Sequence, residues 1–261
     1  MSEAAENLPI RDRFRVRFAK TGLLRWIGHR DLQRLWERLL RRAELRLSMS
    51  EGFNPKPRIG FPSALALGIE GLDEVVEIEL AQPIEAEQLH QRLAADDQPG
   101  LEIRSVRLVA RFHADGTAIA SFPGLSKAKV HSSEYEITLP PSIDAQRVDA
   151  AIAEAKQVGL ITIGRKDKEV TAHIATTFPR FERRDQILHL TQVNTSSASL
   201  KPTDVLNAIG LGDLIEHGAI IRRTKVVLAD ETEQPHAAAS LTLPDTDMSE
   251  TDAGTNSHDL G

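Results

Sequence analysis

The chain has 261 residues, of which 41% are hydrophobic and 27% are charged, and its formal net charge is −6. A chain of this length can bury one large core or two modest ones, and two domains are the better expectation. Because the sequence has no cysteine, disulfides, thiolate nucleophiles, cysteine-ligated zinc and cysteine-held iron–sulfur clusters are excluded.

No segment of the sequence approaches the roughly 20 consecutive apolar residues that a membrane-spanning helix needs. The first residues, MSEAAENLPIRDR, lack the apolar core of a secretory signal. We therefore expect a cytoplasmic protein that does not use a membrane as a partner.

Hydrophobic periodicity predicts an order of strands and helices that occurs twice along the chain. In the first half, strands are expected at 14–18, 58–61, 74–80 and 101–108, and helices at 31–43 and 85–95. In the second half, strands are expected at 135–139, 160–164, 170–174, 187–193 and 219–228, and helices at 143–157 and 202–209. Apart from one extra strand, both halves follow the β-α-β-β-α-β order of a ferredoxin-like unit.

The predicted fold class is α+β, with two tandem ferredoxin-like units at 10–110 and 132–229 and a disordered acidic tail at 230–261. The linker between the units, 109–133, contains Gly, Pro and Ser, which interrupt both periodicities. The tail holds eight acids and no lysine or arginine, and the rest of the chain has 30 acids against 32 bases. Its few apolar residues cannot offset the entropy cost of ordering.

The first predicted strand carries two kinds of side chain on its two faces. Alternation puts Phe14, Val16 and Phe18 on one face and three arginines on the other, namely Arg13, Arg15 and Arg17. On the neighbouring strand of a ferredoxin-like sheet, Glu77 and Glu79 should lie opposite them. We expect a solvated ladder of ion pairs, each contributing about 0.2 to 1 kcal/mol.

The helix at 31–43 is amphipathic and strongly basic. Its predicted apolar face consists of Leu32, Leu35, Trp36, Leu39, Leu40 and Ala43. Its opposite face carries Arg30, Arg34, Arg38, Arg41 and Arg42, opposed only by Asp31, Glu37 and Glu44. Surplus arginine on one face favours phosphate binding, because the guanidinium fork matches two phosphate oxygens. The alternatives are an ordinary solvated face and a protein contact.

The segment 48–58 that follows this helix is predicted to form a stiff loop. Gly52 can adopt positive φ, while Pro55 and Pro57 fix their own φ and restrict the residues before them. Such a loop can present polar side chains at little entropic cost, and the candidate binding residues are Ser50, Asn54, Lys56 and Arg58. The alternative is a connector that sets the register of the next strand.

Other catalytic patterns are absent from the sequence. The nine histidines show no HExxH or HxH spacing, and there is no Walker loop, GxGxxG or GxSxG. The residues thus predict neither a metal nor an organic cofactor. His29 is the one candidate general acid or base, although a structural role at the start of the helix is the favoured interpretation.

Several short motifs together resemble the radical-SAM-linked family, also described as the DUF2344 domain, over roughly 14–211. The motifs are Lys20-Thr21-Gly22, Leu24-Arg25, His29-Arg30-Asp31-Leu32, Ser50-Glu51-Gly52-Phe53-Asn54-Pro55, Leu67-Gly68-Ile69-Glu70 and Ser199-Leu200-Lys201-Pro202. The chain departs from the family at two positions, with Gly28 where Ser is usual and Lys201 where Arg is usual. The resemblance implies a free-standing form and partnership with a radical-SAM enzyme of the cobalamin-binding type.

Because the chain has no cysteine to hold a cluster, it would assist radical chemistry rather than perform it. The first hypothesis is therefore an accessory protein that binds structured RNA or recruits a substrate, in tRNA or rRNA modification or processing. Its predicted contacts are Arg25, Arg30, Arg34, Arg38, Ser50, Asn54, Lys56 and Arg58. One alternative is a metal-independent endoribonuclease, similar to CRISPR repeat-processing enzymes, that uses His29. The other is a protein-interaction subunit of a radical-SAM enzyme that does not contact RNA.

Overall fold

The structure, a computed structural model, describes residues 11–113, 116–120, 127–165, 168–194 and 200–232. Its strands are β1 (Arg11–Lys20), β2 (Ile59–Gly60), β3 (Glu70–Leu80), β4 (Leu101–Phe112), β5 (Ala118–Ala120), β6 (Val130–Thr138), β7 (Leu160–Arg165), β8 (Lys168–His173), β9 (Arg180–Arg184), β10 (Ile187–Val193) and β11 (Ile220–Leu228). Its helices are η1 (Gly22–Trp26), α1 (His29–Arg42), α2 (Ala86–Ala94), α3 (Ala145–Val158), α4 (Ile174–Thr177), α5 (Pro202–Ala208), η2 (Gly212–Leu214) and α6 (Ala229–Thr232). This is the α+β class that the periodicity predicts.

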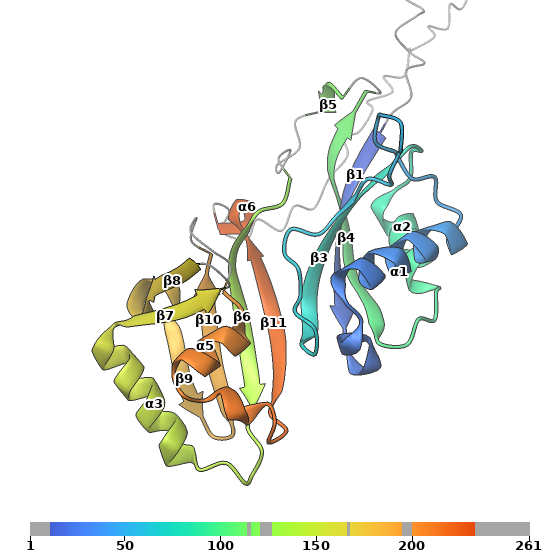
Figure 1. The fold of residues 1–261 in the computed structure, drawn as a ribbon. Helices are drawn as coiled ribbons and strands as arrows, with labels where there is room; N and C mark the ends of the chain where they lie inside the picture. The colour runs from blue at the N-terminus through green and yellow to red at the C-terminus, as the bar shows by residue number, and fades with distance from the viewer. Residues whose placement is uncertain (1–10, 114–115, 121–126, 166–167, 195–199, 233–261) are drawn as a thin grey trace, which may run out of the picture.

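The strands form one large mixed sheet and one separate hairpin (Figure 1). The order in the large sheet is β5-β4-β1-β3-β11-β6-β10-β9, and β2 pairs with β3 outside this path. In the described part of the chain, no helix is long and apolar enough to cross a membrane. The helices α1 and α2 cover one face of the N-terminal half of the sheet, and α3 and α5 cover one face of the C-terminal half.

In the N-terminal half, β1 lies between β3 and β4 and runs antiparallel to both. As the alternation predicts, Phe14, Val16 and Phe18 of β1 are buried against α1 and α2. The helices contribute the rest of this core, chiefly Leu32, Trp36, Leu39, Leu40, Leu89 and Leu93. Burial of these side chains, each worth about 1.5 to 3 kcal/mol, fixes the face of α1 that points to solvent.

In the C-terminal half, β6 lies between β11 and β10, and β9 forms the outer edge beyond β10. All three pairings are antiparallel. A second core joins this sheet to α3 and α5, and it includes Ile137, Val148, Ile152, Leu188, Val205 and Ile221. Each half therefore has its own hydrophobic core.

The two halves are joined edge to edge by β3 and β11, which run parallel. Their backbone register covers only two residue pairs, Arg222 with Glu70 and Arg223 with Gly71. Side chains strengthen this short seam, because Arg222 Nε lies 2.8 Å from Glu70 and Arg223 Nε lies 2.7 Å from Glu74. Burial opposes the charge of Arg223, but pairing with Glu74 outweighs burial and raises its pKa.

The strands predicted at 160–164 and 170–174 are confirmed as β7 and β8, which pair with each other in a separate hairpin. Two other details of the predicted strand order are wrong. β9 is an additional strand that the periodicity does not predict, because RFERR contains a single apolar residue. The predicted linker 109–133 also contains strand residues, since β4 extends to Phe112, β5 pairs with β4, and β6 begins at Val130.

The beginning of the predicted acidic tail is ordered into α6. Asp230 lies 2.8 Å from Arg15 Nη1, and Glu231 lies 2.7 Å from Arg17 Nη2. Buried or half-buried arginines on the sheet thus hold the first two acids of the tail in place, which corrects the prediction of disorder for those residues. The rest of that prediction, 233–261, falls outside the described residues.

Candidate nucleic-acid interface

The solvent face of α1 carries a row of arginines, as the sequence predicts. Leu32, Leu35, Trp36, Leu39 and Leu40 are buried, and Ala43 is half-buried. Arg30, Arg34, Arg38 and Arg41 are exposed on the opposite side. Because a helix rises about 1.5 Å per residue, this row extends for about 16 Å along the surface.

Few carboxylates neutralise the row. Arg34 approaches Asp31 at 3.3 Å in an exposed pair, which contributes little. Arg42 forms a two-pronged bond with Asp96, with distances of 2.6 and 2.9 Å. Within the ranges that the structure describes, Arg30, Arg38 and Arg41 form no ion pair. Their guanidinium groups retain their hydrogen-bonding capacity for a ligand.

His29 is the first residue of α1, two positions before the predicted start, and Gly28 is the N-cap. Gly28 caps without a side-chain hydrogen bond, as expected where it replaces Ser. The exposed His29 ring packs edge-on against Phe61 at a centroid distance of 5.2 Å. This contact fits the structural role that the sequence favours for His29.

The predicted stiff loop is held by backbone bonds across its base. Met49 and Pro57 form an isolated β-bridge, and Ser50 N donates to Lys56 O at 2.8 Å. Lys56 N donates in return to Ser50 Oγ at 2.9 Å. Gly52 has a φ of 115°, in the region that favours glycine, so the chain can turn at the loop's tip.

The loop and the row on α1 lie on different faces of the sheet. Lys56 and Arg58 line a groove of about 320 Å³ together with Arg13, Glu77 and Glu79. Those sheet residues point away from the helices, because they alternate with the core residues of β1 and β3. The structure therefore separates the candidates of the loop from those of α1.

Arg25 is engaged at the seam between the two halves rather than free. Its guanidinium lies 3.6 Å from Glu70 and stacks on the Trp26 ring at 5.1 Å. Glu70 also accepts from Gly22 N at 3.1 Å and from Arg222 Nε at 2.8 Å. Burial favours the neutral form of Glu70, but these bonds outweigh burial and lower its pKa.

The arginines of β1 are paired but not solvated. Arg13 contacts Glu79 at 2.7 Å and Arg15 contacts Glu77 at 3.0 Å, as the register predicts, whereas Arg17 pairs with Asp73 and Glu231. Arg13, Arg15 and both glutamates are buried, so the expectation of a solvated ladder is wrong. The physical reason is that α6 and residues 127–130 cover this face of β1 and exclude solvent from it. The periodicity of β1 cannot reveal these distant segments.

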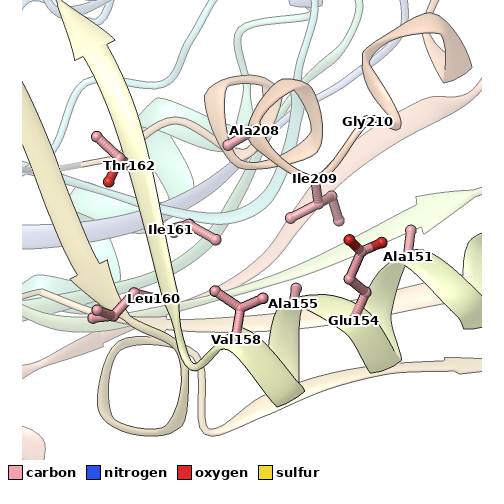
Figure 2. A pocket seen from close by; sticks show the side chains of 10 residues that line it. All are labelled: Ala151, Glu154, Ala155, Val158, Leu160, Ile161, Thr162, Ala208, Ile209 and Gly210. Atoms are coloured by element: carbon pink, nitrogen blue, oxygen red, sulfur yellow. The ribbon is translucent and has the colours of Figure 1, made fainter.

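A second groove, of about 370 Å³, lies in the C-terminal half between α3, β7 and the end of α5 (Figure 2). Most of its lining residues have apolar side chains, and Val158, Leu160 and Ile209 are among the larger ones. Glu154 supplies its one charged side chain. This groove contains none of the predicted site residues, and its chemistry does not suit a polyanion.

A family model described as an uncharacterized protein conserved in bacteria, DUF2344, matches residues 13–202. The chain belongs to the DUF2344 family. A comparison with curated proteins finds no match. The DUF2344 match covers α1, the stiff loop and β3, while β11 and α6 follow it in the chain.

The DUF2344 motifs include residues whose structural role the sequence does not reveal. Lys20 is buried, and its Nζ donates to Ile27 O at 3.0 Å. Burial lowers the pKa of Lys20, and nearby Glu74 offsets part of this effect. The sequence does contain a signal for the burial of Lys20. Alternation along the strand puts Lys20 on the same face as Phe14, Val16 and Phe18, and a charged group on a buried face needs a hydrogen-bond partner.

Proposed function

We propose that this DUF2344 protein is an RNA-binding accessory protein of the cytoplasm that contacts phosphates through the exposed face of α1. The observation that carries the proposal is the group of exposed arginines without a carboxylate partner in the described structure: Arg30, Arg38 and Arg41. An arginine that no carboxylate neutralises can exchange a bound counterion for a phosphate, and released counterions favour binding.

We infer that the architecture is a tandem of two ferredoxin-like units. Two sheet orders support this inference, β4-β1-β3-β2 in the first half and β11-β6-β10-β9 in the second. The hairpin of β7 and β8 is then an insertion in the second unit. Such units favour RNA over duplex DNA as the ligand, because sheets and loops grip single strands more readily than they enter a major groove.

The proposed role is that of a helper to an enzyme of the radical-SAM class, in tRNA or rRNA modification or processing. The likeness of the motifs to a radical-SAM-linked domain supports this role. The absence of cysteine supports it too, because the chain has no thiolate that could hold an iron–sulfur cluster. In this proposal the protein supplies RNA affinity and its partner supplies the chemistry.

The test is a titration of the full-length protein with tRNA and rRNA fragments between about 50 and 200 mM salt. The double variant Arg34→Ala and Arg38→Ala should bind about tenfold more weakly. Loss of two phosphate contacts should also reduce the slope of log K against log salt by about 1.4 for an unpaired strand. The matched control removes two exposed cations from the other half, with Lys156→Ala and Arg184→Ala, and should bind like the wild type.

An RNA affinity and a salt slope that are unchanged in the α1 variant would contradict the proposal.

The same samples also test whether the protein cleaves RNA. RNA that stays intact after long incubation in EDTA is the result expected of a binding protein, whereas cleavage that disappears in His29→Ala would replace the proposal with a ribonuclease.

A second candidate function is binding to a protein, and an exposed apolar surface favours it. Trp26, Leu67 and Ile215 are exposed around a groove of about 230 Å³ at the seam between the halves, and Leu23 is exposed nearby in η1. Clusters of exposed apolar side chains commonly mark protein contacts. If a radical-SAM enzyme co-purifies with the native protein, Leu67→Glu should abolish its recovery without affecting RNA affinity.

A further inference from the structure

The groove behind the stiff loop has the features of a phosphate site. It lies between the loop and the face of β3 that points away from the helices, and its volume is about 320 Å³. Its polar lining consists of Arg13, Ser50, Lys56, Arg58, Glu77, Glu79 and Lys127. Four separate segments, namely β1, the loop, β3 and the linker at Lys127, thus converge on one concave surface.

Arginines of β1 already neutralise the charges of both carboxylates in this groove. Arg13 contacts Glu79 Oε1 at 2.7 Å, and Arg11 Nε lies 3.0 Å from Glu79 Oε2, although that oxygen accepts no hydrogen bond in the described structure. Glu77 accepts from Arg15 at 3.0 Å and from Ala128 N at 3.2 Å. Three arginines thus face two glutamates, so neither glutamate has negative charge left to neutralise the groove's other cations.

The other cations of the groove, Lys56, Lys127 and Arg58, can still bind an anion. Lys56 and Lys127 are exposed, and neither ammonium group forms an ion pair with any residue that the structure describes. Arg58 donates from Nε to Met49 O at 3.1 Å, and its nearest carboxylate oxygens, on Glu79 and Glu51, are 3.8 and 3.9 Å away. The terminal nitrogens of Arg58 therefore remain available as donors. The rim of the groove carries surplus positive charge.

The rim is also preorganised. The reciprocal bonds between Ser50 and Lys56 and the bridge between Met49 and Pro57 hold the base of the loop. Ser50 Oγ accepts from Lys56 N, which leaves its hydroxyl proton free to donate to a ligand oxygen. Little ordering entropy is then lost when an anion binds.

An aromatic side chain stands at the tip of the same loop. Phe53 is fully exposed and Met49 is 45% exposed, which leaves apolar surface in contact with water. An exposed phenyl ring beside surplus positive charge suits the stacking of an unpaired base next to its phosphate.

The loop lies beyond the C-terminal end of α1 at the sheet edge. Exposed Arg46 lies in the chain between Arg41, where the row on α1 ends, and the loop. Ser48 N donates to Glu79 O at the end of β3. An RNA strand that follows the row on α1 can therefore continue around this edge.

We propose that the groove holds a phosphate of an unpaired RNA strand while the adjacent base stacks on Phe53. The inference rests on the proposed RNA-binding function and names the form of RNA at a second contact. It also predicts a preference for single-stranded segments, since a base inside a duplex is not free to stack on a protein side chain.

The test uses the full-length protein and a short uridine oligonucleotide, either intact or with one abasic position, in fluorescence anisotropy titrations. Lys56→Ala with Lys127→Ala should weaken binding of both oligonucleotides about tenfold and lower the salt slope by about 1.4. Phe53→Ala should weaken binding of the intact oligonucleotide by about 5- to 150-fold and affect the abasic one less. Because Lys56, Lys127 and Phe53 are exposed, unchanged circular dichroism is expected.

Each outcome separates this inference from the α1 proposal. If Arg34→Ala with Arg38→Ala weakens binding while the groove variants and Phe53→Ala match the Lys156→Ala with Arg184→Ala control, the inference is overturned and the α1 proposal stands. If the groove variants and Phe53→Ala weaken binding and the α1 variant does not, the groove is the RNA site and the α1 proposal falls. A wild-type protein that binds neither oligonucleotide overturns the inference.

Discussion

Two arginine-rich elements of the N-terminal half, α1 and β1, differ in whether their arginines are exposed or buried. Each carries at least four arginines within a stretch of 14 residues or fewer. Those of α1 are mostly exposed and include three without an ion pair in the described structure, whereas Arg13 and Arg15 of β1 are buried and paired. The number of arginines therefore says little about which of them can reach a ligand.

The difference arises from neighbours that are distant in the sequence. β1 is a central strand, so β3 places Glu77 and Glu79 opposite its arginines, and α6 adds Asp230 and Glu231. α1 has the sheet on one side and solvent on the other, and no strand brings acids to its outer face. Partners supplied by the topology neutralise the arginines of β1, whereas Arg30, Arg38 and Arg41 of α1 form no ion pair in the described structure.

The largest expected effect comes from breaking a buried pair on β1. Arg15→Ala leaves the buried Glu77 without its arginine and Asp230 without its partner, so the free energy of unfolding should fall by about 3 to 5 kcal/mol. The matched change on α1, Arg38→Ala, should alter it by no more than about 0.5 kcal/mol. Urea denaturation of both variants measures the two values, and similar losses would erase the contrast between the two elements.

A smaller effect is expected from the acids of α6. Asp230→Asn with Glu231→Gln keeps the shape of the contacts but removes the charges that face Arg15 and Arg17. Because these acids are partly exposed and each arginine keeps a second carboxylate, the loss should be about 1 to 2 kcal/mol. The same measurement on Glu233→Gln serves as the control. A double variant as stable as the wild type would mean that α6 does not contribute to the cover.

The smallest expected effect concerns acid stability at the seam. The pKa of Glu70 lies below its ordinary value of 4.5, so its contribution to stability is complete above about that pH and is lost as pH falls through the folded-state pKa. The glutamine in Glu70→Gln cannot titrate. When the pH falls from neutral to acid, the free energy of unfolding of this variant should therefore decrease by on the order of 1 kcal/mol less than that of the wild type. Parallel unfolding curves at each pH test this, and equal losses in both proteins would contradict it.

The sequence predicts much of the N-terminal half because its signals are local. Alternation along β1 identifies Phe14, Val16 and Phe18 as core residues, and it also predicts that the arginines between them lie opposite Glu77 and Glu79. The buried face of α1 also follows directly from helical spacing. In each case the pattern lies within one element or between two expected neighbours.

The features that the sequence does not predict depend on longer-range packing. β9 has too few apolar residues to show a period, and it is a strand because β10 offers it an edge. The burial of the β1 arginines depends on α6, more than 200 residues away in the chain. The candidate contacts on the loop are assigned to a different face from those on α1 only once the register of β1 and β3 is known.

The contrast between the two sets of arginines is tested most directly by labelling with an arginine-selective dicarbonyl reagent, read by mass spectrometry with and without RNA. We expect Arg30, Arg38 and Arg41 to react rapidly in the free protein and to be protected when RNA is bound. Arg13 and Arg15 should stay unreactive in both states. Equal reactivity of Arg15 and Arg38 in the free protein, or no protection of the α1 arginines by RNA, would contradict the account.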